Sequence, residues 1–194
     1  MRAWIEMVSP DAADGKLAEL YEKARTPAGT VDNVMQAHSL RPHTMAGHVA
    51  LYRAVLHHPD NTLPDWFLEA VGSYTSILNG CEYSLTHHWH NARALLGGGE
   101  TGDAALAALD NREPERAFEG KFLALLQYVE KLTLAPATIT QEDVDGLRTS
   151  GASDGEILET NQVCGYFNYV NRHLNGLGVS TEGDKIGYYD EPGS

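Results

Sequence analysis

Apolar residues recur every three or four positions along almost the whole chain, and this spacing is the feature that most restricts the fold. It is typical of amphipathic α-helices. Glycine and proline stand mostly at the joints between the periodic segments, and no pair of alternating apolar segments indicates a β-hairpin. The sequence therefore predicts an all-α fold.

Two periodic segments in the middle of the chain predict a pair of helices joined by a short turn. Pro64 opens the first helix, and Asn79 and Gly80 supply its C-terminal stop. The second helix runs from about Cys81 to Leu96, where three consecutive glycines interrupt it. Because the joint is short, we expect the two helices to pack against each other.

Three other helix starts carry capping signals. Ser9 followed by a proline predicts a helix that begins there. Thr140 and Ser153 each precede an acidic residue by three positions and resemble the first residues of capping boxes.

Length and composition fit one domain. The chain has 194 residues, of which 42% are hydrophobic, enough to bury one sizeable core. We expect a single domain over residues 1–194, with an N-terminal extension over about residues 1–30. The polar, acidic tail over about residues 180–194 is expected to form an arm or a frayed end rather than core.

The balance of charges excludes some classes of partner. The chain carries 27 acidic and 14 basic residues, a formal net charge of -13, which would repel a phosphate backbone. Nucleic acid and anionic membranes are therefore not expected as partners. The N-terminus lacks the apolar run of a signal peptide, and no stretch approaches the roughly 20 apolar residues of a membrane span. We expect a soluble, cytoplasmic protein.

Reactive side chains gather on one face of the helix that begins at Cys81. At 100° per residue, Cys81, Ser84 and His88 fall within an arc of about 60°, on the side that also carries apolar residues and must pack inward. Backbone N–H groups and the helix dipole favour the thiolate form of a cysteine in the first turn. An imidazole on the same face can deliver or remove a proton near neutral pH.

Each of these residues also has a purely structural interpretation. A histidine on an apolar face is more often bonded to a carbonyl group in the core, and a cysteine there is more often inert packing. Glu69 lies off the apolar stripe of its own helix, so the pattern predicts a solvated carboxylate. The aromatic residues near these positions are interpreted as core packing: Trp66, Phe67, Tyr74 and Tyr83.

No metal or cofactor is expected. Histidines are dense at positions 57–58 and 87–90, but no His-Glu-x-x-His pattern is present, and the helix turns His88 away from His87 and His90. Haem, flavin and nicotinamide have no visible motif in the chain.

The spacing of the candidate residues resembles the signature of the AhpD-like (carboxymuconolactone decarboxylase) superfamily, which is Glu, eleven residues, then Cys-x-x-Cys-x-x-x-His. Here Glu69 is followed after eleven residues by Cys81, Ser84 and His88, so three of the four positions match. The surrounding segments, over about residues 30–180, are similar to the peroxidase-related branch of that superfamily.

This resemblance implies an AhpD-like helical bundle that assembles into homotrimers or homohexamers. It also implies that Glu69 and His88 flank a buried redox dithiol as a proton relay. The activity best known in the family is the antioxidant reduction of hydroperoxides at the expense of thiols, an oxidoreductase reaction.

Ser84 departs from the family pattern at the position usually assigned the peroxide-reducing role. A serine hydroxyl cannot be oxidised to a sulfenic acid, so Cys81 and Ser84 cannot close a disulfide. Cys164 is too remote in sequence to be assigned as a substitute. Three explanations stay open: a one-cysteine peroxidase that uses an external thiol, a redirected non-redox enzyme, or a serine introduced for study.

Three functions follow from these residues. In a one-cysteine thiol peroxidase, Cys81 is the nucleophile, Glu69 and His88 relay protons, and Ser84 donates a hydrogen bond to the thiolate. In a cofactor-free lyase, decarboxylase or isomerase acting on a small molecule, Glu69 and His88 form the acid/base pair. The third function is a non-catalytic oligomeric binding protein. A Ser84 hydrolase is disfavoured because no nucleophile-elbow glycines accompany the serine.

Overall fold

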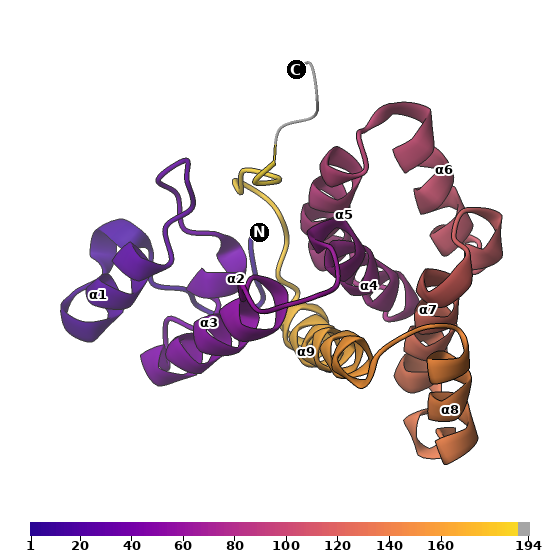
Figure 1. The fold of residues 1–194 in the computed structure, drawn as a ribbon. Coiled ribbons are helices and arrows are strands. Elements are labelled where there is room, and N and C mark those ends of the chain that lie inside the picture. Colours follow the sequence, from indigo (N-terminus) through magenta and orange to yellow (C-terminus); the bar gives the residue numbers. More distant parts are fainter. Residues whose placement is uncertain (190–194) are drawn as a thin grey trace.

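The structure is a computed structural model, and it describes residues 1–189. Within this range the chain forms α-helices and short 3-10 turns and contains no β-strand, which confirms the predicted all-α class (Figure 1). The helices are α1 (Gly15–Lys23), α2 (Asn33–Gln36), α3 (Pro42–Leu56), α4 (Asp65–Leu78), α5 (Glu82–Leu95), α6 (Gly99–Asp110), α7 (Gly120–Leu134), α8 (Gln141–Thr149) and α9 (Asp154–Leu177).

Helix α4 is the centre of the bundle. Residues 67–76 of this helix are all buried, because α5, α7 and α9 pack around it (Figure 1). Gly72 allows α9 to approach closely. A Cβ atom at Gly72 would lie 2.3 Å from Cε2 of Phe167, so no other residue fits there without movement of the ring. The tight contact between α4 and α9 fixes the wall on which the candidate site is built.

The packing of α4 shows that the prediction of a solvated Glu69 is wrong. Glu69 is only 1% exposed. The amphipathic pattern assumes that one side of a helix faces water. Since neighbouring helices cover α4 on several sides, the polar side of the helix is also buried, and its carboxylate needs partners inside the protein.

Most of the predicted helix boundaries are confirmed. Helices α4 and α5 form the expected pair around the turn at Gly80, and both predicted capping boxes, at Thr140 and Ser153, are present. The helix predicted to begin after Ser9 is wrong. The chain there makes only a 3-10 turn, and α1 begins at Gly15, because the two intervening residues are extended and Gly15 itself has a φ of 47°.

The two ends of the chain lie beside the main bundle. The N-terminal residues form a second, smaller apolar cluster between α1 and α3, centred on Leu17, Tyr21, Val31 and Met45. After α9 the chain turns at Gly178 and continues as an extended arm between the N-terminal helices and α5 (Figure 1). This C-terminal arm, residues 180–189, is the arm that the sequence offered as one alternative. Residues 190–194 of the predicted tail lie outside the described residues. No helix within residues 1–189 is both long and apolar enough to cross a membrane.

Candidate active site

A carboxylate and an imidazole meet where α4 contacts α5. Nδ1 of His88 lies 2.7 Å from Oε2 of Glu69, and Oε1 of Glu69 accepts a hydrogen bond from the Asn91 side chain at 3.2 Å. The exposed fractions of the two side chains are 13% for His88 and 2% for Glu69. Because a carboxylate only accepts, Nδ1 carries the shared proton, and Nε2 is the nitrogen free to exchange one with a substrate.

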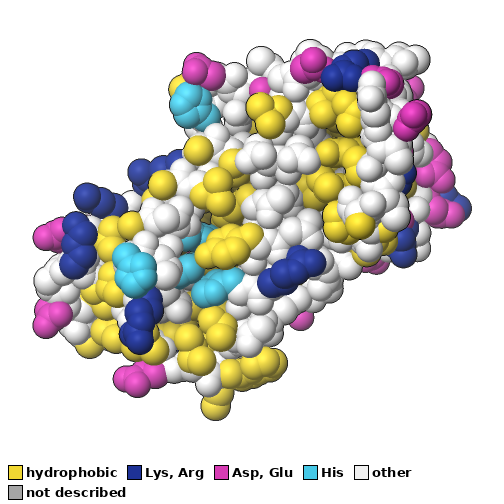
Figure 2. All heavy atoms as spheres, turned by 90° about the horizontal axis from the view of Figure 1, so that it is seen from below, with side chains coloured by type: hydrophobic (Ala, Val, Ile, Leu, Met, Phe, Trp, Pro, Cys, Tyr) yellow, Lys and Arg dark blue, Asp and Glu magenta, His cyan; other side chains and the backbone are white. Residues whose placement is uncertain are grey.

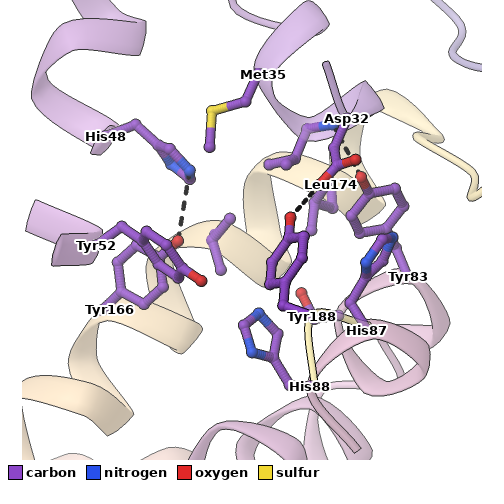
Figure 3. Close-up of a pocket in the computed structure, with 13 residues that line it drawn as sticks. Asp32, Met35, His48, Tyr52, Tyr83, His87, His88, Tyr166, Leu174 and Tyr188 are labelled. Carbon is purple, nitrogen blue, oxygen red and sulfur yellow. Dashed lines mark hydrogen bonds between the residues drawn. The ribbon is translucent and has the colours of Figure 1, made fainter. Parts of the chain in front are cut away.

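A cavity of about 50 Å³ lies beside this pair (Figure 3). It lies between the α2 region, α3, α5, α9 and the C-terminal arm. Its lining includes Ser84 and His88 from α5, Tyr52 from α3, Tyr166 from α9 and Asp32 from the turn before α2. Side chains that carry hydroxyl, carboxylate and imidazole groups therefore line one partly open cavity.

Aromatic rings fix the orientation of His88. Phe167 meets the imidazole edge-on with ring centroids 4.6 Å apart, and Tyr52 approaches from another side at 6.4 Å. The Tyr52 hydroxyl is paired with Nε2 of His57 at 2.8 Å. Burial raises the pKa of Tyr52 and of Tyr166, so both phenols stay protonated and can donate hydrogen bonds.

Cys81 lies beneath the cavity rather than in its wall. The residue is 1% exposed, belongs to the hydrophobic core cluster and does not line the cavity. Burial raises the pKa of the Cys81 thiol, and hydrogen bonds from the backbone and hydroxyl of Ser84 and from Asn171 oppose the rise only in part. Its place as N-cap of α5 therefore does not make it a thiolate at neutral pH.

Ser84 faces the cavity and Cys81, but it is not activated by His88. Among residues 1–189, no hydrogen bond joins the Ser84 hydroxyl to the imidazole. The serine, histidine and glutamate thus do not form a connected hydrolytic triad. Of the four predicted site residues, Glu69 and His88 are in direct contact, Ser84 lies beside them, and Cys81 is covered.

Cys164 is also a buried free thiol. It is 0% exposed and is paired with the hydroxyl of Thr133 at 3.3 Å. Burial raises the pKa of this thiol too. The residue is part of the core between α7 and α9.

The interpretation of the aromatic residues as core holds for Phe67 and Tyr74, which are fully buried. Tyr83 belongs both to the core and to the cavity wall. Its hydroxyl donates to Oδ2 of Asp184 at 2.5 Å and accepts from the backbone N–H of Val34 at 3.1 Å. Tyr83 thereby connects α5 to the α2 region and to the C-terminal arm.

Several polar residues of the site were missed by sequence reasoning. Asn91 stands three residues after His88 on the same helix face, a spacing that could have identified it. Asp32 and Tyr188 come from the two ends of the chain, and only the fold brings them together. The Tyr188 hydroxyl donates to the Asp32 carboxylate, and the Tyr188 backbone N–H donates to Oδ1 of Asn91 at 2.9 Å (Figure 3).

Two buried histidines, His38 and His48, form a cluster with the half-buried His173 beside the cavity. The rings of His38 and His173 are stacked at 4.3 Å between centroids, and His38 lies 5.0 Å from His48, which lines the cavity. Burial lowers the pKa of His38 to about 4 and that of His48 to about 3. Among residues 1–189, no group of three or more histidine, cysteine or acidic side chains is placed to hold a metal ion.

The fold is that of the AhpD-like, peroxidase-related proteins. An uncharacterized peroxidase-related protein from Ralstonia eutropha JMP134 with the AhpD core superposes with a TM-score of 0.81, covering 93% of both chains at 19% identity. One from Silicibacter sp. TM1040 gives a TM-score of 0.80 over 98% of this chain and 95% of its own, at 22% identity. The debrominase Bmp8 gives 0.66 over 94% and 92%, at 16% identity. No protein-family model and no curated protein matches the chain.

Proposed function

We propose that the protein is a member of the AhpD-like superfamily that acts as a cofactor-free acid/base enzyme on a small molecule. The observation that carries this proposal is the contact between Glu69 and His88, which lines a cavity, with the Cys81 thiol buried outside the cavity wall. Proton transfer of this kind serves a lyase, a decarboxylase or an isomerase. A cavity lined by His88, with Glu69 directly behind the imidazole, also favours an enzyme over a binding protein.

In this mechanism His88 is the group that exchanges protons with the substrate. Glu69 holds Nδ1–H and so leaves the lone pair on Nε2, which takes a proton from the substrate and later returns it to another atom. The buried carboxylate stabilises the imidazolium that forms between these two steps. Asn91 holds the other oxygen of Glu69 and keeps the carboxylate in the plane that His88 requires.

Deuterium exchange tests the proposal without advance knowledge of the product. Small neutral carbonyl compounds and lactones are incubated with the protein in heavy water, and the incorporation of deuterium at carbon is followed by NMR. The expected result is exchange that the wild type and Cys81→Ala catalyse and that His88→Gln loses by about a hundredfold or more, within the range for general acid–base catalysis. Exchange that depends on Cys81 and not on His88 would contradict the proposal.

A second candidate is the one-cysteine peroxidase, favoured by the polar groups of Ser84 and Asn171 near the Cys81 thiol, which oppose the rise in its pKa. A Cys81 thiolate would attack one peroxide oxygen, break the O–O bond and become a sulfenic acid, while the leaving oxygen takes a proton from His88. Two equivalents of an external thiol would then restore the cysteine. Intact-mass analysis after a peroxide challenge tests this. A gain of one oxygen in the wild type but not in Cys81→Ala would support it.

The resemblance to Bmp8 supports a small-molecule substrate. A cysteine-to-alanine variant of that debrominase, which is similar to this chain at a TM-score of 0.66 and 16% identity, was solved in complex with 2,3,4-tribromopyrrole. A bundle of this architecture is therefore able to bind a compact ring.

The trimer or hexamer expected from the family stays a proposal. Apolar side chains are exposed on the face shown in Figure 2, with histidines among them. Ile5, Leu40 and Tyr169 line a surface depression of about 400 Å³ together with His38 and His173. Exposed apolar residues of this kind are common where subunits meet. Light scattering of the purified protein gives the number of subunits.

A further inference from the structure

The C-terminal arm places a tyrosine side chain in the wall of the candidate site. Tyr188 lines the cavity of about 50 Å³ beside His88 and also a neighbouring cavity of about 280 Å³. Both cavities share Asp32, Met35 and Tyr52 as lining residues. Figure 3 shows the Tyr188 ring between Asp32 and His88. Tyr188 is therefore one of four residues on the border between the two spaces, and removal of its side chain would join them at this border.

Tyr188 is held less firmly by the rest of the protein than Asp184, near the start of the C-terminal arm. Asp184 is buried, with 3% of its side chain exposed, and accepts hydrogen bonds from the α2 backbone and from the Tyr83 hydroxyl. Tyr188 is 40% exposed and makes one hydrogen bond through its hydroxyl and one through its backbone N–H. Displacing Tyr188 thus breaks two hydrogen bonds, whereas Asp184 keeps its own partners in α2 and on Tyr83.

Gly187 lets the arm bring Tyr188 to this position. Its φ is 80°, in the left-handed region, and a Cβ atom there would lie 1.9 Å from Cδ2 of His90. Gly183, just before the Asp184 anchor, also has a left-handed φ, of 89°. The path of the arm therefore depends on a glycine directly before the tyrosine.

Tyr188 satisfies the Asp32 carboxylate only in part. Asp32 is 4% exposed, and its Oδ2 accepts the Tyr188 hydroxyl. Its Oδ1 is buried and has no hydrogen-bond partner within the described part of the chain. An unpaired buried carboxylate oxygen is costly, so a donor supplied from the cavity would be stabilising. Two adjacent acceptor oxygens match two adjacent donors on a single ring.

We propose that the joined cavity binds a catechol, a small aromatic ring with two adjacent hydroxyl groups, in the place of Tyr188. The phenol ring of Tyr188 shows that a six-membered ring with a hydroxyl fits this place. One ligand hydroxyl would donate to Oδ2 of Asp32 and its neighbour to Oδ1. Glu69 and Asp184 also lie close by, so a neutral donor fits better than an anion. The inference names a ligand class for the proposed acid/base site and rests on that function for the role of His88, although binding itself requires no turnover.

Calorimetric titration of the full chain with catechol tests the inference. Tyr188→Ala opens the cavity beside His88. Tyr189→Ala is the matched control, because Tyr189 is on the same arm but lines only the neighbouring cavity of about 280 Å³. Removal of the competing side chain raises the fraction of binding-competent protein. We expect catechol to bind Tyr188→Ala at least about tenfold more tightly than it binds the wild type or Tyr189→Ala.

Two comparisons identify the hydrogen-bond donors on the ligand and the acceptor on the protein. Phenol is expected to bind Tyr188→Ala more weakly than catechol does, and 1,2-dimethoxybenzene, which has the same ring without a donor, is expected not to bind. Asp32→Asn in the Tyr188→Ala background is expected to weaken catechol binding by about tenfold or more. If that double variant is unfolded by circular dichroism, the series of three ligands on Tyr188→Ala alone decides the question.

Equal affinity of the wild type and Tyr188→Ala for catechol would overturn the inference, as would equal affinity of Tyr188→Ala for catechol and 1,2-dimethoxybenzene. Heat of binding does not depend on catalysis. Catechol binding without deuterium exchange would therefore contradict the proposed function alone, whereas exchange that requires His88 without catechol binding would contradict only the catechol site.

Discussion

The buried histidines make stability depend on pH, and His48 offers the sharpest test. His48 faces His38 from the α2 region, His173 and Tyr166 from α9, His88 from α5 and Tyr52 on its own helix. None of these groups is a carboxylate that would stabilise an imidazolium. Burial lowers the pKa of His48 to about 3, from near 6.5 in an unfolded chain.

The direction in which pH changes the stability follows from the number of protons that the folded and unfolded states bind. Between the folded and unfolded pKa values, the unfolded chain holds a proton on His48 and the folded chain does not, so falling pH favours unfolding. The stability is fully present above pH 6.5 and is lost as the pH falls toward the folded value. Between about pH 7.5 and pH 5.5, His48 alone removes about 1.4 kcal/mol of unfolding free energy. His38, with a pKa of about 4, adds a similar loss.

Urea denaturation at the two pH values measures this loss. His48→Gln is expected to shrink the pH dependence of the unfolding free energy by about 1.4 kcal/mol relative to the wild type. His43→Gln is the matched control, because His43 lies on the same helix but is exposed, and its replacement should leave the pH dependence unchanged. Comparison of variants cancels the contribution of carboxylates such as Asp32. Equal pH dependence in His48→Gln and the wild type would refute the reasoning.

Three further predictions follow from packing and caps. Gly72→Ala should lower the unfolding free energy by about 1–3 kcal/mol, because the added Cβ atom clashes with the Phe167 ring. Gly47→Ala is the control, since a Cβ atom there contacts nothing, and equal urea midpoints for the two variants would contradict the prediction. Cys81 should react with a chromogenic thiol reagent at least about tenfold more slowly in the native protein than in urea, and rapid native labelling would show an accessible thiol. Ser153→Ala should cost about 1 kcal/mol by thermal denaturation, and an unchanged melting temperature would contradict the role of the capping box.

The fold could be predicted from the sequence wherever local signals agree with tertiary packing. Apolar spacing, capping boxes and the turn at Gly80 are local, and they place α4, α5, α8 and α9 correctly. The prediction of a helix that begins directly after Ser9 was wrong. The proline there opens only a 3-10 turn, because extended residues and the left-handed Gly15 follow it.

Only the part of the candidate site that lies on the paired helices α4 and α5 could be predicted from the sequence. Cys81, Ser84 and His88 do share an inward face, because offsets of three and seven residues are fixed by the geometry of a helix. The depth of Cys81 below the cavity depends on helices that no local pattern describes. Asp32 and Tyr188 are 156 residues apart in the chain, and no local spacing connects them.

A continuous hydrogen-bonded path joins the arm to the candidate base, and its direction can be worked out from the chemistry of each group. Glu69 only accepts, so Asn91 must turn its amide N–H toward it, and Oδ1 of Asn91 then faces the backbone N–H of Tyr188. The same carboxylate fixes the proton on Nδ1 of His88. Glu69 and Asn91 therefore connect the arm to the imidazole. A ligand that lifts Tyr188 frees one acceptor on Asn91 beside Glu69, and the site is opened without breaking the contact between Glu69 and His88.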